Sequence, residues 1–337
     1  MEIQEQVSLK PHNTFGIEVN AKYFVEVKTE AELVELCKSD FLDGKQHLVV
    51  GSGSNILFTK DYDGVIIKNS IQGVVFKKSG KLIRVIAGGG VNWNDLVIES
   101  LEKGANGLEN LALIPGTVGA APVQNIGAYG VELKEIFEQL KAVEVATGKV
   151  KVFTKAQCTF AYRTSVFKKE LKGKYIISEV TLDLHNTKKV NTTYGAIGLL
   201  LKRKNIEEPT SKDVCEAVIS IRESKLPDPA KIGNAGSFFK NPVIPKIDYK
   251  ELQIKNNGMP AFPQANNKVK VPAAWLIEDT GWKGKTIENV GVSPIQSLVL
   301  VNHGGASGKD IKELSKEIQD SVFKKFKIRL EVEVNIL

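Results

Sequence analysis

A short glycine-rich turn is the first segment of this 337-residue chain that could do chemistry. Residues 51–55 read Gly-Ser-Gly-Ser-Asn and follow a short apolar run. Consecutive backbone N–H groups in such a turn can surround an anion, and the side chains of Ser52, Ser54 and Asn55 add donors. The turn is not a Rossmann fingerprint, because Ile56 stands where the third glycine is required. A phosphate-binding loop and a plain turn between two strands are equally good interpretations.

Arg163 lies in an aromatic and partly apolar setting, with Phe160 and Tyr162 before it and Phe167 after it. A buried guanidinium needs an anionic partner, because its desolvation is otherwise costly. That partner is either a carboxylate of the same chain, which is the commoner case, or an acid group of a substrate.

Ser237 lies in residues 233–242, which combine small polar residues with two phenylalanines and lack helical or strand periodicity. Held between Gly236 and Phe238, its hydroxyl could contact a ligand. The chain has no Gly-x-Ser-x-Gly motif, and its four histidines lack a recognisable partner arrangement. A functional Ser237 would therefore donate a proton or a hydrogen bond rather than act as a nucleophile. A serine that only packs a turn is the commoner alternative.

The end of the chain alternates between apolar and polar residues over positions 328–336. This period of two predicts a closing strand with Arg329, Glu331, Glu333 and Asn335 on one face. A catalytic glutamate would require that face to line a cleft, whereas a solvated face is the usual arrangement. The period alone does not choose between Glu331 and Glu333.

Residues 107–130 contain five glycines, two prolines and hardly any charge, so they fit neither an amphipathic helix nor a solvated loop. Glycine is used where the backbone needs a positive φ or where another group approaches closely. The apolar residues between these glycines indicate burial. A bed for a large, flat, partly polar cofactor is favoured over the alternative, a tight crossing of two backbone segments.

The elements that must position these segments mix strands and helices in the first part of the chain. A capping box from Thr29 to Glu32 predicts a helix over residues 30–38. Strands are predicted over residues 47–50, 65–68 and 82–86. Asn92 and Asp95 are expected to cap a helix that stops at Gly104.

After residue 140 the pattern changes to longer alternating segments. Residues 142–152 predict a hairpin around a Thr-Gly turn, and residues 175–184 predict a further strand. Ser211 is expected to cap a helix that ends near Ser224, and the prolines that follow mark a domain boundary. The last region is expected to hold a strand near residues 298–301, a helix over 309–326 and the closing strand.

Composition restricts the class of protein. Apolar content of 42% and charged content of 25% are typical of a soluble globular chain, and 337 residues suffice for two or three domains. No apolar run reaches the length of a membrane span, and the N-terminus does not read as a secretory signal. Three cysteines without metal-ligand spacing indicate free thiols. We therefore expect a cytoplasmic protein without a metal site, and a monomer, because no exposed apolar stripe is evident.

The net charge of +7 comes from lysines and arginines that are spread along the chain. Nucleic-acid binders usually concentrate basic residues on a stripe or a helix. Small anionic ligands such as phosphates and carboxylates explain the excess as well as nucleic acid does, so the charge alone does not decide.

Taken in order, these segments resemble the UDP-N-acetylenolpyruvoylglucosamine reductase (UDP-N-acetylmuramate dehydrogenase) family, flavoproteins of bacterial peptidoglycan synthesis. The resemblance rests on residues 10–16, 51–55, 108–116, 124–130, 162–165, 222–229, 233–242 and 330–333, and so covers essentially the whole chain. It implies an α+β fold: the FAD-binding fold of the vanillyl-alcohol-oxidase (PCMH) type with a C-terminal α/β substrate-binding domain. Residues 1–70, joined by 328–337, and residues 71–226 would form two FAD-binding subdomains, and residues 227–327 the substrate domain.

The resemblance also implies the reaction. FAD is expected to bind without a covalent link, and NADPH is expected to deliver hydride to flavin N5. Hydride would then pass to the enol-ether carbon of UDP-N-acetylglucosamine enolpyruvate to give UDP-N-acetylmuramate, with no nucleic-acid or membrane partner. The preference for NADPH over NADH rests on the resemblance alone, because no adenine-ribose pocket is readable in the sequence.

Residue roles follow from the resemblance position by position. Arg163 matches the cation that stabilises an enolate-like intermediate, Glu333 rather than Glu331 matches its acid partner, and Ser237 matches the proton donor to the substrate carbon. The positions that match FAD contacts are Gly51, Ser52, Gly53, Ser54, Asn55, Pro115, Gly116, Gly119, Gln124, Asn125, Gly127, Ala128, Tyr129, Gly130 and Arg222. The positions that match substrate contacts are Tyr162, Tyr194, Lys225, Asn241, Lys270 and Gln296.

Phe262 departs from the pattern of the longer subclass of this family, in which a tyrosine closes over the substrate diphosphate. Its ring could still stack on a ligand, but it has no hydroxyl group, so the closing contact is not assigned to it.

Two other functions fit part of the pattern. A different flavin oxidoreductase of the same superfold, acting on an alcohol or a sugar, would share the 51–55 loop and the glycine-rich bed. It would lack the 233–242 segment and would usually carry a covalent-flavin residue. A non-catalytic nucleotide-sugar-binding protein would use the basic residues only to bind, and it would be colourless when purified.

Overall fold

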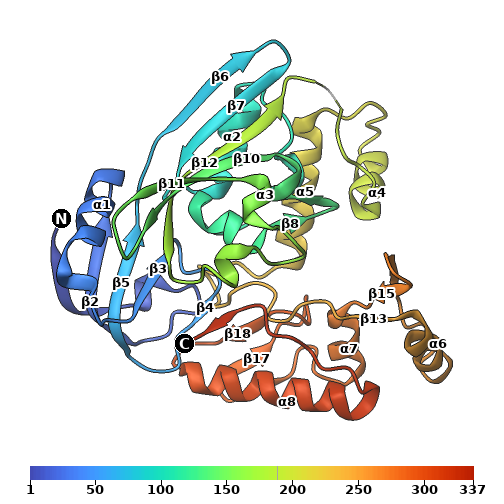
Figure 1. Ribbon diagram of the computed structural model, residues 1–337. Coiled ribbons are helices and arrows are strands. Elements are labelled where there is room, and N and C mark those ends of the chain that lie inside the picture. The colour runs from blue at the N-terminus through green and yellow to red at the C-terminus, as the bar shows by residue number, and fades with distance from the viewer. Residues whose placement is uncertain (188) are drawn as a thin grey trace. The chain divides into compact units, whose positions relative to one another are not determined.

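Each of the two units of this chain is assembled from segments that are far apart in sequence. The computed structural model describes residues 1–187 and 189–337, which Figure 1 colours from blue to red. Residues 1–7, 21–52 and 62–224 make the first unit, and residues 8–20, 53–61 and 225–337 make the second. The chain therefore passes between the units several times before it enters the second unit for good at Lys225.

The first unit contains a four-stranded sheet in the order β1 (Ile3–Ser8), β2 (Asn20–Val27), β5 (Tyr62–Asn69) and β3 (His47–Val50). Both β2 and β3 run parallel to β5. The predicted helix is confirmed as α1 (Glu30–Lys38), and its capping box is formed. Glu32 N donates to Thr29 Oγ1 at 3.1 Å, and Thr29 N donates to Glu32 Oε2 at 3.3 Å. The turn η2 (Asp40–Leu42) follows this helix.

A five-stranded antiparallel sheet forms the larger part of the first unit. Its order is β11 (Val150–Thr154), β10 (Phe137–Glu144), β12 (Tyr175–His185), β7 (Leu82–Gly88) and β6 (Val74–Ser79). The predicted hairpin over residues 142–152 is confirmed, with Gly148 at φ +66° in its turn. In Figure 1 α2 lies behind the long strands of this sheet.

The helices of the first unit begin where short polar side chains cap them. Asn92 Oδ1 accepts from the backbone of Asn94 and Asp95 at the start of α2 (Trp93–Glu102), and Gly104 follows with φ +72°. Both ends of this helix therefore agree with the sequence prediction. The remaining helices and turns of this part of the chain are α3 (Lys155–Cys158), η6 (Val166–Lys168), α4 (Gly195–Arg203) and α5 (Ser211–Lys225).

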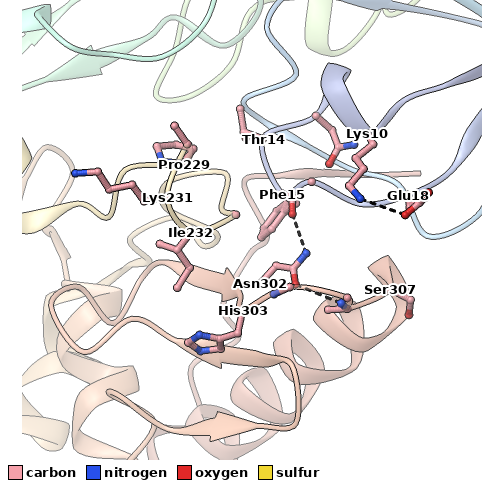
Figure 2. A pocket seen from close by; sticks show the side chains of 17 residues that line it. Lys10, Thr14, Phe15, Glu18, Pro229, Lys231, Ile232, Asn302, His303 and Ser307 are labelled. Carbon is pink, nitrogen blue, oxygen red and sulfur yellow. Dashed lines mark hydrogen bonds and ion pairs between the residues drawn. The ribbon is translucent and has the colours of Figure 1, made fainter.

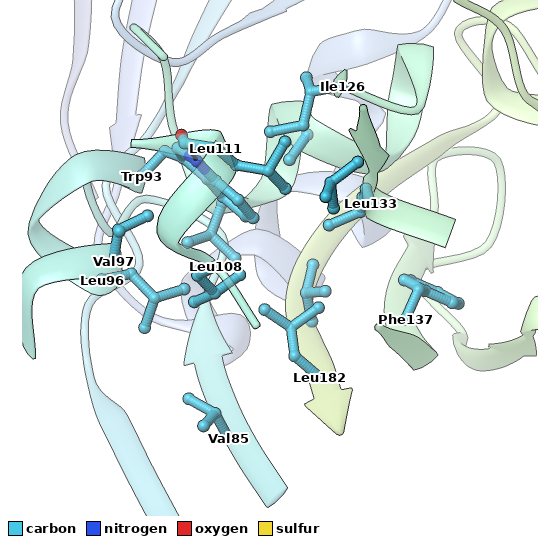
Figure 3. Packing of buried hydrophobic residues seen from close by; sticks show 14 of the residues in the cluster. Val85, Trp93, Leu96, Val97, Leu108, Leu111, Ile126, Leu133, Phe137 and Leu182 are labelled. Carbon is cyan, nitrogen blue, oxygen red and sulfur yellow. Dashed lines mark hydrogen bonds between the residues drawn. The ribbon is translucent and has the colours of Figure 1, made fainter. Parts of the chain in front are cut away.

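The glycine-rich segment 107–130 contributes directly to the core of the first unit. Its apolar side chains at Leu108, Leu111 and Ile126 pack together with Trp93 of α2 (Figure 3). Trp93 Nε1 also donates to the Leu111 carbonyl at 3.0 Å. The expected burial is therefore confirmed. The segment and the chain that follows form η3 (Glu109–Leu111), η4 (Val118–Gln124), β8 (Gly127–Ala128), β9 (Val131–Glu132) and η5 (Leu133–Glu135).

The second unit packs helices against two small sheets. One sheet has the order β16 (Thr286–Ile287), β17 (Val290–Val292), β18 (Leu300–Asn302), and α8 (Gly308–Phe326) packs against it. The other has the order β13 (Val243–Pro245), β15 (Lys268–Lys270), β14 (Phe262–Gln264), next to α6 (Lys246–Lys255). The unit also contains η1 (Lys10–His12), α7 (Ala273–Asp279) and the parallel pair β4 (Ile56–Leu57) and β19 (Asn335–Ile336).

The predicted closing strand over residues 328–336 is only partly a strand. Ladder pairing is confined to Asn335 and Ile336, with one isolated bridge between Val332 and Phe239. The predicted alternation of burial is nevertheless present, because Ile328, Leu330 and Val334 are buried while the residues between them are more exposed. The alternation in sequence therefore predicted which side chains are buried. It did not predict how many of these residues pair with another strand.

The predicted cap of α5 was wrong by one residue. Asp213 N donates to Thr210 Oγ1 at 3.2 Å and Thr210 N donates to Asp213 Oδ2 at 2.8 Å, so Thr210 is the capping residue. Ser211 is the first residue of the helix, and its buried hydroxyl has no hydrogen-bond partner among the described residues. Thr210 and Ser211 both carry a hydroxyl group near the start of the helix. Thr210 is the capping residue because it stands three positions before Asp213, the spacing of a capping box.

Within the described residues, no helix combines the length and the apolar character that crossing a bilayer requires.

The two hydroxyls at the start of α5 give a matched test of stability. Thr210→Ala should lower the free energy of unfolding by about 1 kcal/mol, because the helix loses its capping acceptor. Ser211→Ala should not lower it, since that hydroxyl satisfies no partner. Urea unfolding of the two variants beside the wild type measures both effects. A larger loss in Ser211→Ala than in Thr210→Ala would contradict the assignment of the cap.

Candidate functional site

The first half of the 51–55 loop is built against the glycine-rich segment of the first unit. A Cβ at Gly51 would lie 2.3 Å from Thr117 Oγ1, so no larger residue fits there without displacing that side chain. The Ser52 hydroxyl is buried and has no hydrogen-bond partner among the described residues. Leaving a buried hydroxyl unsatisfied costs free energy, which a ligand with acceptor oxygens could recover.

Lys68 of β5 is a residue of this loop's surroundings that sequence reasoning missed. Its Nζ donates to the Gly51 carbonyl at 2.5 Å. Burial lowers the pKa of the Lys68 ammonium group, and the charge of Glu26 acts in the opposite direction. The only sign of this contact in the sequence was a lysine at the end of an apolar strand. The Gly51 carbonyl to which Lys68 donates lies 17 residues earlier in the chain. A cation thus lies directly behind the loop.

The second half of the loop belongs to the second unit and is held by residues 9–17. Gly53 has φ +67°, and a Cβ there would lie 2.0 Å from the His12 carbonyl oxygen. Thr14 N donates to the Gly53 carbonyl at 3.2 Å. The buried Asn13 side chain shapes the supporting turn, because its Nδ2 donates to the carbonyls of Leu9 and Ile17 at 2.7 and 3.0 Å.

The glycines of residues 107–130 serve two different purposes. Gly119 N donates to the Gly89 carbonyl at 2.8 Å, and a Cβ at Gly119 would lie 3.0 Å from Gly89 Cα. The tight backbone crossing, which was the alternative interpretation, is therefore correct for this position. Gly116 and Gly130 instead adopt φ of +128° and +83°, a region that side chains disfavour. Their carbonyls are used within the unit, because Trp93 N donates to Gly116 at 3.1 Å and Asn191 Nδ2 donates to Gly130 at 3.4 Å.

A buried carboxylate stabilises the start of this segment. Glu109 is 3% exposed, and its Oε2 accepts from Gly107 N at 2.7 Å. Burial raises the pKa of the Glu109 carboxyl group, while hydrogen bonds from the local backbone lower it. The Glu109 carboxylate therefore stabilises the backbone of its own segment.

Arg163 lies against the end of the glycine-rich segment in the first unit. Its Nη2 donates to the Gly127 carbonyl at 2.6 Å, and its guanidinium lies 5.4 Å from the centre of the Tyr162 ring. A Cβ at Gly127 would lie 3.1 Å from Arg163 Nη1, so the small residue admits the arginine. Arg163 itself has φ +54°, a backbone conformation that non-glycine residues adopt rarely. The structure thus places Tyr162, Arg163, Gly127 and Ala128 together.

Arg222 of α5 adds a second guanidinium to this group. Its Nε donates to the Leu113 carbonyl at 3.2 Å, and its charge interacts with the Tyr129 hydroxyl. Burial lowers the pKa of Arg222, Tyr129 raises it, and the charge of Arg163 lowers it further. Burial also raises the pKa of the Tyr129 hydroxyl. Two neighbouring cations in a partly buried setting favour an anionic ligand.

Tyr194 completes the cluster of predicted site residues in the first unit. Its ring packs edge-on against the Tyr129 ring, with centroids 5.1 Å apart and an interplanar angle of 82°. Tyr194 immediately precedes α4, and 45% of its surface is exposed. The predicted residues Tyr129, Arg163, Tyr194 and Arg222, which are scattered over 94 positions of sequence, are thus connected through direct contacts or charge interactions.

In the second unit the segment after Gly236 lies between two other segments of the chain. Ser237 forms an antiparallel bridge with Val299, and Phe238 N donates to the Leu298 carbonyl at 2.7 Å. On the other side Glu333 N donates to the Phe238 carbonyl at 2.8 Å. The fully buried Phe238 ring anchors this arrangement. Ser237 and Glu333 thereby come from neighbouring segments although they are 96 residues apart.

Glu331 and Glu333 differ in their surroundings. The Glu331 carboxylate pairs with Lys240 Nζ, and 71% of its side chain is exposed. Glu333 is half-buried, and its backbone carbonyl accepts from Asn55 Nδ2 at 3.5 Å. Glu331 therefore has a structural partner on the surface, whereas Glu333 lies beside the segment that carries Ser237 and beside the end of the 51–55 loop.

The remaining predicted substrate residues of the second unit are spread over several elements. Asn241 Oδ1 accepts from Ala273 N at 2.9 Å, so part of its side chain caps α7. Gln296 Oε1 accepts from Leu298 N at 3.4 Å. Lys270 of β15 pairs in register with Phe262 of β14, and the Phe262 ring is 57% exposed. Lys225 lies exposed at the end of α5.

A cavity of about 940 Å³ in the second unit contains none of the predicted site residues. Figure 2 shows it between the 10–18 turn, residues 229–233 and the start of α8. Polar groups in its wall already have partners: Lys10 Nζ pairs with Glu18 at 3.2 Å, and Asn302 Nδ2 donates to the Phe15 carbonyl at 2.9 Å. The cavity is therefore not part of the candidate site.

The cysteines are buried free thiols, as the sequence predicted. Burial raises the pKa of Cys37 and Cys215 to about 11 and that of Cys158 to about 12. Such thiols stay protonated and are poor nucleophiles. No cluster of His, Cys, Asp and Glu suited to a metal ion occurs in the described part of the chain.

Comparison with known sequences and structures adds independent information. Residues 228–337 match the family described as "UDP-N-acetylenolpyruvoylglucosamine reductase, C-terminal domain", and residues 21–154 match the "FAD binding domain" family. Proteins named UDP-N-acetylenolpyruvoylglucosamine reductase from Amoebophilus asiaticus and Flavobacterium johnsoniae are 49% and 45% identical, each over 100% of both chains. The one from Pseudomonas aeruginosa is 42% identical over 100% of this chain and 99% of its own.

A solved structure supports the fold. The crystal structure of UDP-N-acetylenolpyruvylglucosamine reductase from Thermus caldophilus superimposes with a TM-score of 0.69 at 22% identity, covering 100% of this chain and 99% of that one. The α+β FAD-binding fold expected from the sequence is thereby confirmed.

Two glycines with the same φ test how tightly the 51–55 loop is built. Gly16→Ala should cost about 1–2 kcal/mol, because φ +67° disfavours a side chain but no atom lies within 4 Å of the new Cβ. Gly53→Ala has the same φ and meets the His12 carbonyl as well, so it should cost clearly more. Urea unfolding measures both. Equal losses would show that the loop can move away from residues 9–17.

Proposed function

Because this chain belongs to the UDP-N-acetylenolpyruvoylglucosamine reductase family, we propose that it reduces UDP-N-acetylglucosamine enolpyruvate to UDP-N-acetylmuramate, with FAD as cofactor and NADPH as electron donor. The observation that carries this proposal is the pair of full-length relatives at 49% and 45% identity. The match of residues 228–337 to the family's own C-terminal domain argues against an alcohol or sugar oxidase of the same superfold.

The residues of the first unit fit a bound FAD. Ser52 offers an unsatisfied buried hydroxyl, Lys68 supplies a cation behind the loop, and Gly116 and Gly130 adopt backbone conformations that disfavour side chains. Arg222 and Tyr129 add donors beside this surface. When bound, FAD supplies hydride transfer from NADPH to the double bond of the substrate. We assign the cofactor to Gly51, Ser52, Gly53, Ser54, Asn55, Pro115, Gly116, Gly119, Gln124, Asn125, Gly127, Ala128, Tyr129, Gly130 and Arg222.

Arg163 and Glu333 are assigned to the charge that develops on the substrate. When hydride adds to the methylene carbon, the electron pair of the C=C bond moves toward the substrate carboxylate. A guanidinium aimed at this carboxylate lowers the barrier, because the charge is greater in the transition state than in the ground state. Glu333, as a carboxylic acid, shares its proton with the same oxygen atoms.

Ser237 is assigned the final proton transfer. The proton of its hydroxyl passes to the carbon next to the carboxylate, a C–H bond forms, and the serine oxygen recovers a proton from solvent. The sum is one hydride from NADPH and one proton added across the double bond. A serine hydroxyl is a weak acid, so this step depends on alignment, which the fixed backbone between residues 298–299 and 332–333 favours.

We assign the UDP portion of the substrate, by their match to the family pattern, to the side chains of Tyr162, Tyr194, Lys225, Asn241, Lys270 and Gln296. Lysine side chains suit a diphosphate as point charges. Consistent with these assignments, we propose that residues 1–70 with 328–337 and residues 71–226 hold the cofactor, that residues 227–327 hold the substrate, and that the enzyme acts as a cytoplasmic monomer in peptidoglycan precursor synthesis.

A spectrum and a coupled assay test the function directly. The purified protein should be yellow from bound flavin, and it should oxidise NADPH rapidly only after UDP-N-acetylglucosamine enolpyruvate is added. A colourless protein that binds the nucleotide sugar would indicate a binding protein. Rapid NADPH oxidation that does not respond to the enolpyruvyl substrate would point to a different flavin enzyme.

Ser237→Ala should slow reoxidation of the reduced flavin by the substrate about 100- to 10,000-fold, the usual contribution of a positioned proton donor. Flavin reduction by NADPH should change less than about twofold, since no serine proton is needed for it. Stopped-flow absorbance separates the two steps, and Ser224→Ala, at an exposed serine at the end of α5, is the matched control. Reoxidation of Ser237→Ala at the wild-type rate would remove the assigned role.

The two glutamates of the closing segment provide a second matched pair. Glu333→Gln should slow the same reoxidation step about 100-fold or more, because an amide does not share an acidic proton with the substrate carboxylate. Glu331→Gln should leave the rate within about twofold, since its carboxylate pairs with Lys240 at the surface. The reverse order of the two effects would reassign the acid.

A further inference from the structure

Asn110 is a buried residue of the first unit that has no role in the function proposed above. It is 2% exposed and lies in η3. Its Nδ2 donates to the Tyr129 carbonyl at 3.0 Å and to the Asn191 carbonyl at 2.9 Å. An amide nitrogen has two N–H donors, so both are used on segments that are 62 residues apart.

One of these hydrogen bonds fixes Tyr129 in a strained conformation. Tyr129 has φ +49°, which costs a non-glycine residue free energy and persists only where the surroundings hold it. Asn110 holds the carbonyl of this residue, and Gly130 follows with φ +83°. Burial raises the pKa of the Tyr129 hydroxyl, while the charge of Arg222 lowers it.

The other hydrogen bond fixes the chain just before Tyr194. Asn191 returns a contact to the glycine-rich segment, because its Nδ2 donates to the Gly130 carbonyl at 3.4 Å. Its Oδ1 accepts from Thr193 N at 3.1 Å, which shapes the turn into Tyr194. Tyr194 then begins α4 and packs its ring on Tyr129. Asn110 thus donates to both backbone segments that carry the paired rings.

The residues on either side of Asn110 are themselves held by hydrogen bonds. The neighbouring Glu109 carboxylate accepts from Gly107 N at 2.7 Å, and the Leu111 carbonyl accepts from the Trp93 ring at 3.0 Å. A buried side-chain amide that makes both of its hydrogen bonds holds the two bonded backbone segments in fixed positions. Without it, the described contacts of the 191–194 segment with the glycine-rich segment would be the longer Asn191 hydrogen bond to Gly130 and the packing of the Tyr194 ring on Tyr129.

We propose that Asn110 is a positioning residue that presets Tyr194 for the substrate, through paired hydrogen bonds to the Tyr129 and Asn191 carbonyls. This inference rests on the proposed function, because Tyr194 is assigned there to the UDP portion of the substrate. Preset groups bind with a smaller loss of conformational entropy, so the effect of Asn110 is on substrate affinity.

A double-mutant cycle tests this coupling in the FAD-loaded enzyme. Asn110→Ala should raise KM for UDP-N-acetylglucosamine enolpyruvate about tenfold, as loss of two hydrogen bonds allows. Tyr194→Ala should also raise it. In the double variant, KM should lie within about twofold of Tyr194→Ala alone, because Asn110 acts through that ring. Independent effects that multiply, or an unchanged KM in Asn110→Ala, would overturn the proposal. An inactive wild type would instead reject the proposed function.

Hydrogen exchange gives a readout that does not depend on activity. Amides of residues 191–197 should exchange faster in Asn110→Ala than in the wild type, without added substrate. The matched control is Asn106→Ala, which removes an amide donor to the Thr187 carbonyl (2.9 Å) in the same part of the chain. It should leave both KM and exchange at 191–197 unchanged. If Asn110→Ala does not fold, Asn110→Ser, which keeps one donor, should show the same effects at smaller size. Unchanged exchange in a folded variant would contradict the proposal.

Discussion

The hydrogen bond from Gly119 N to the Gly89 carbonyl holds the glycine-rich segment against the main sheet of the first unit. A side chain does not fit at Gly89, where a Cβ would lie 2.5 Å from the Ile177 carbonyl oxygen of β12, and a Cβ at Gly119 would lie 3.0 Å from Gly89 Cα. The rest of the cluster depends on this approach. This contact fixes the segment to the sheet. From that position the Gly127 carbonyl accepts from Arg163, and Tyr129 interacts with the charge of Arg222. Asn110 donates to the Asn191 carbonyl.

Charge in this cluster follows from the same packing. Arg222 is brought into a setting where burial lowers its pKa, and the hydrogen-bond acceptor described for it is the Leu113 carbonyl oxygen rather than a carboxylate. The carboxylate that lies in the segment, Glu109, is used on the local backbone. The buried charge of Arg222 agrees with a nucleotide cofactor and a substrate that carries a diphosphate and a carboxylate. The net charge of +7 alone could not have located this site.

The sequence predicted the features that depend on near neighbours. The caps at Thr29 and Asn92, the 142–152 hairpin and the burial of residues 107–130 are each set within a few residues. The closing strand was overpredicted, because alternation records burial and the pairing partner lies elsewhere in the chain. Lys68 and Asn110 were missed for a related reason: their partners are backbone carbonyls 17 to 81 residues away, which no pattern of side chains records. The roles of Arg163, Ser237 and Glu333 came from family resemblance, since each residue type has commoner structural uses.

The division of the chain into interleaved units has a consequence for how the protein is made. The core of the second unit includes Phe15, Ile17 and Leu57 together with side chains from beyond residue 225. These three are synthesised first, yet their packing partners leave the ribosome roughly 200 residues later. At about 5–20 residues per second, the wait is on the order of 10–40 s. During that time, apolar side chains of the second unit remain uncovered on a nascent chain whose first unit is still growing. Because each unit is made of three separate segments, no single cut of the chain can separate the two units.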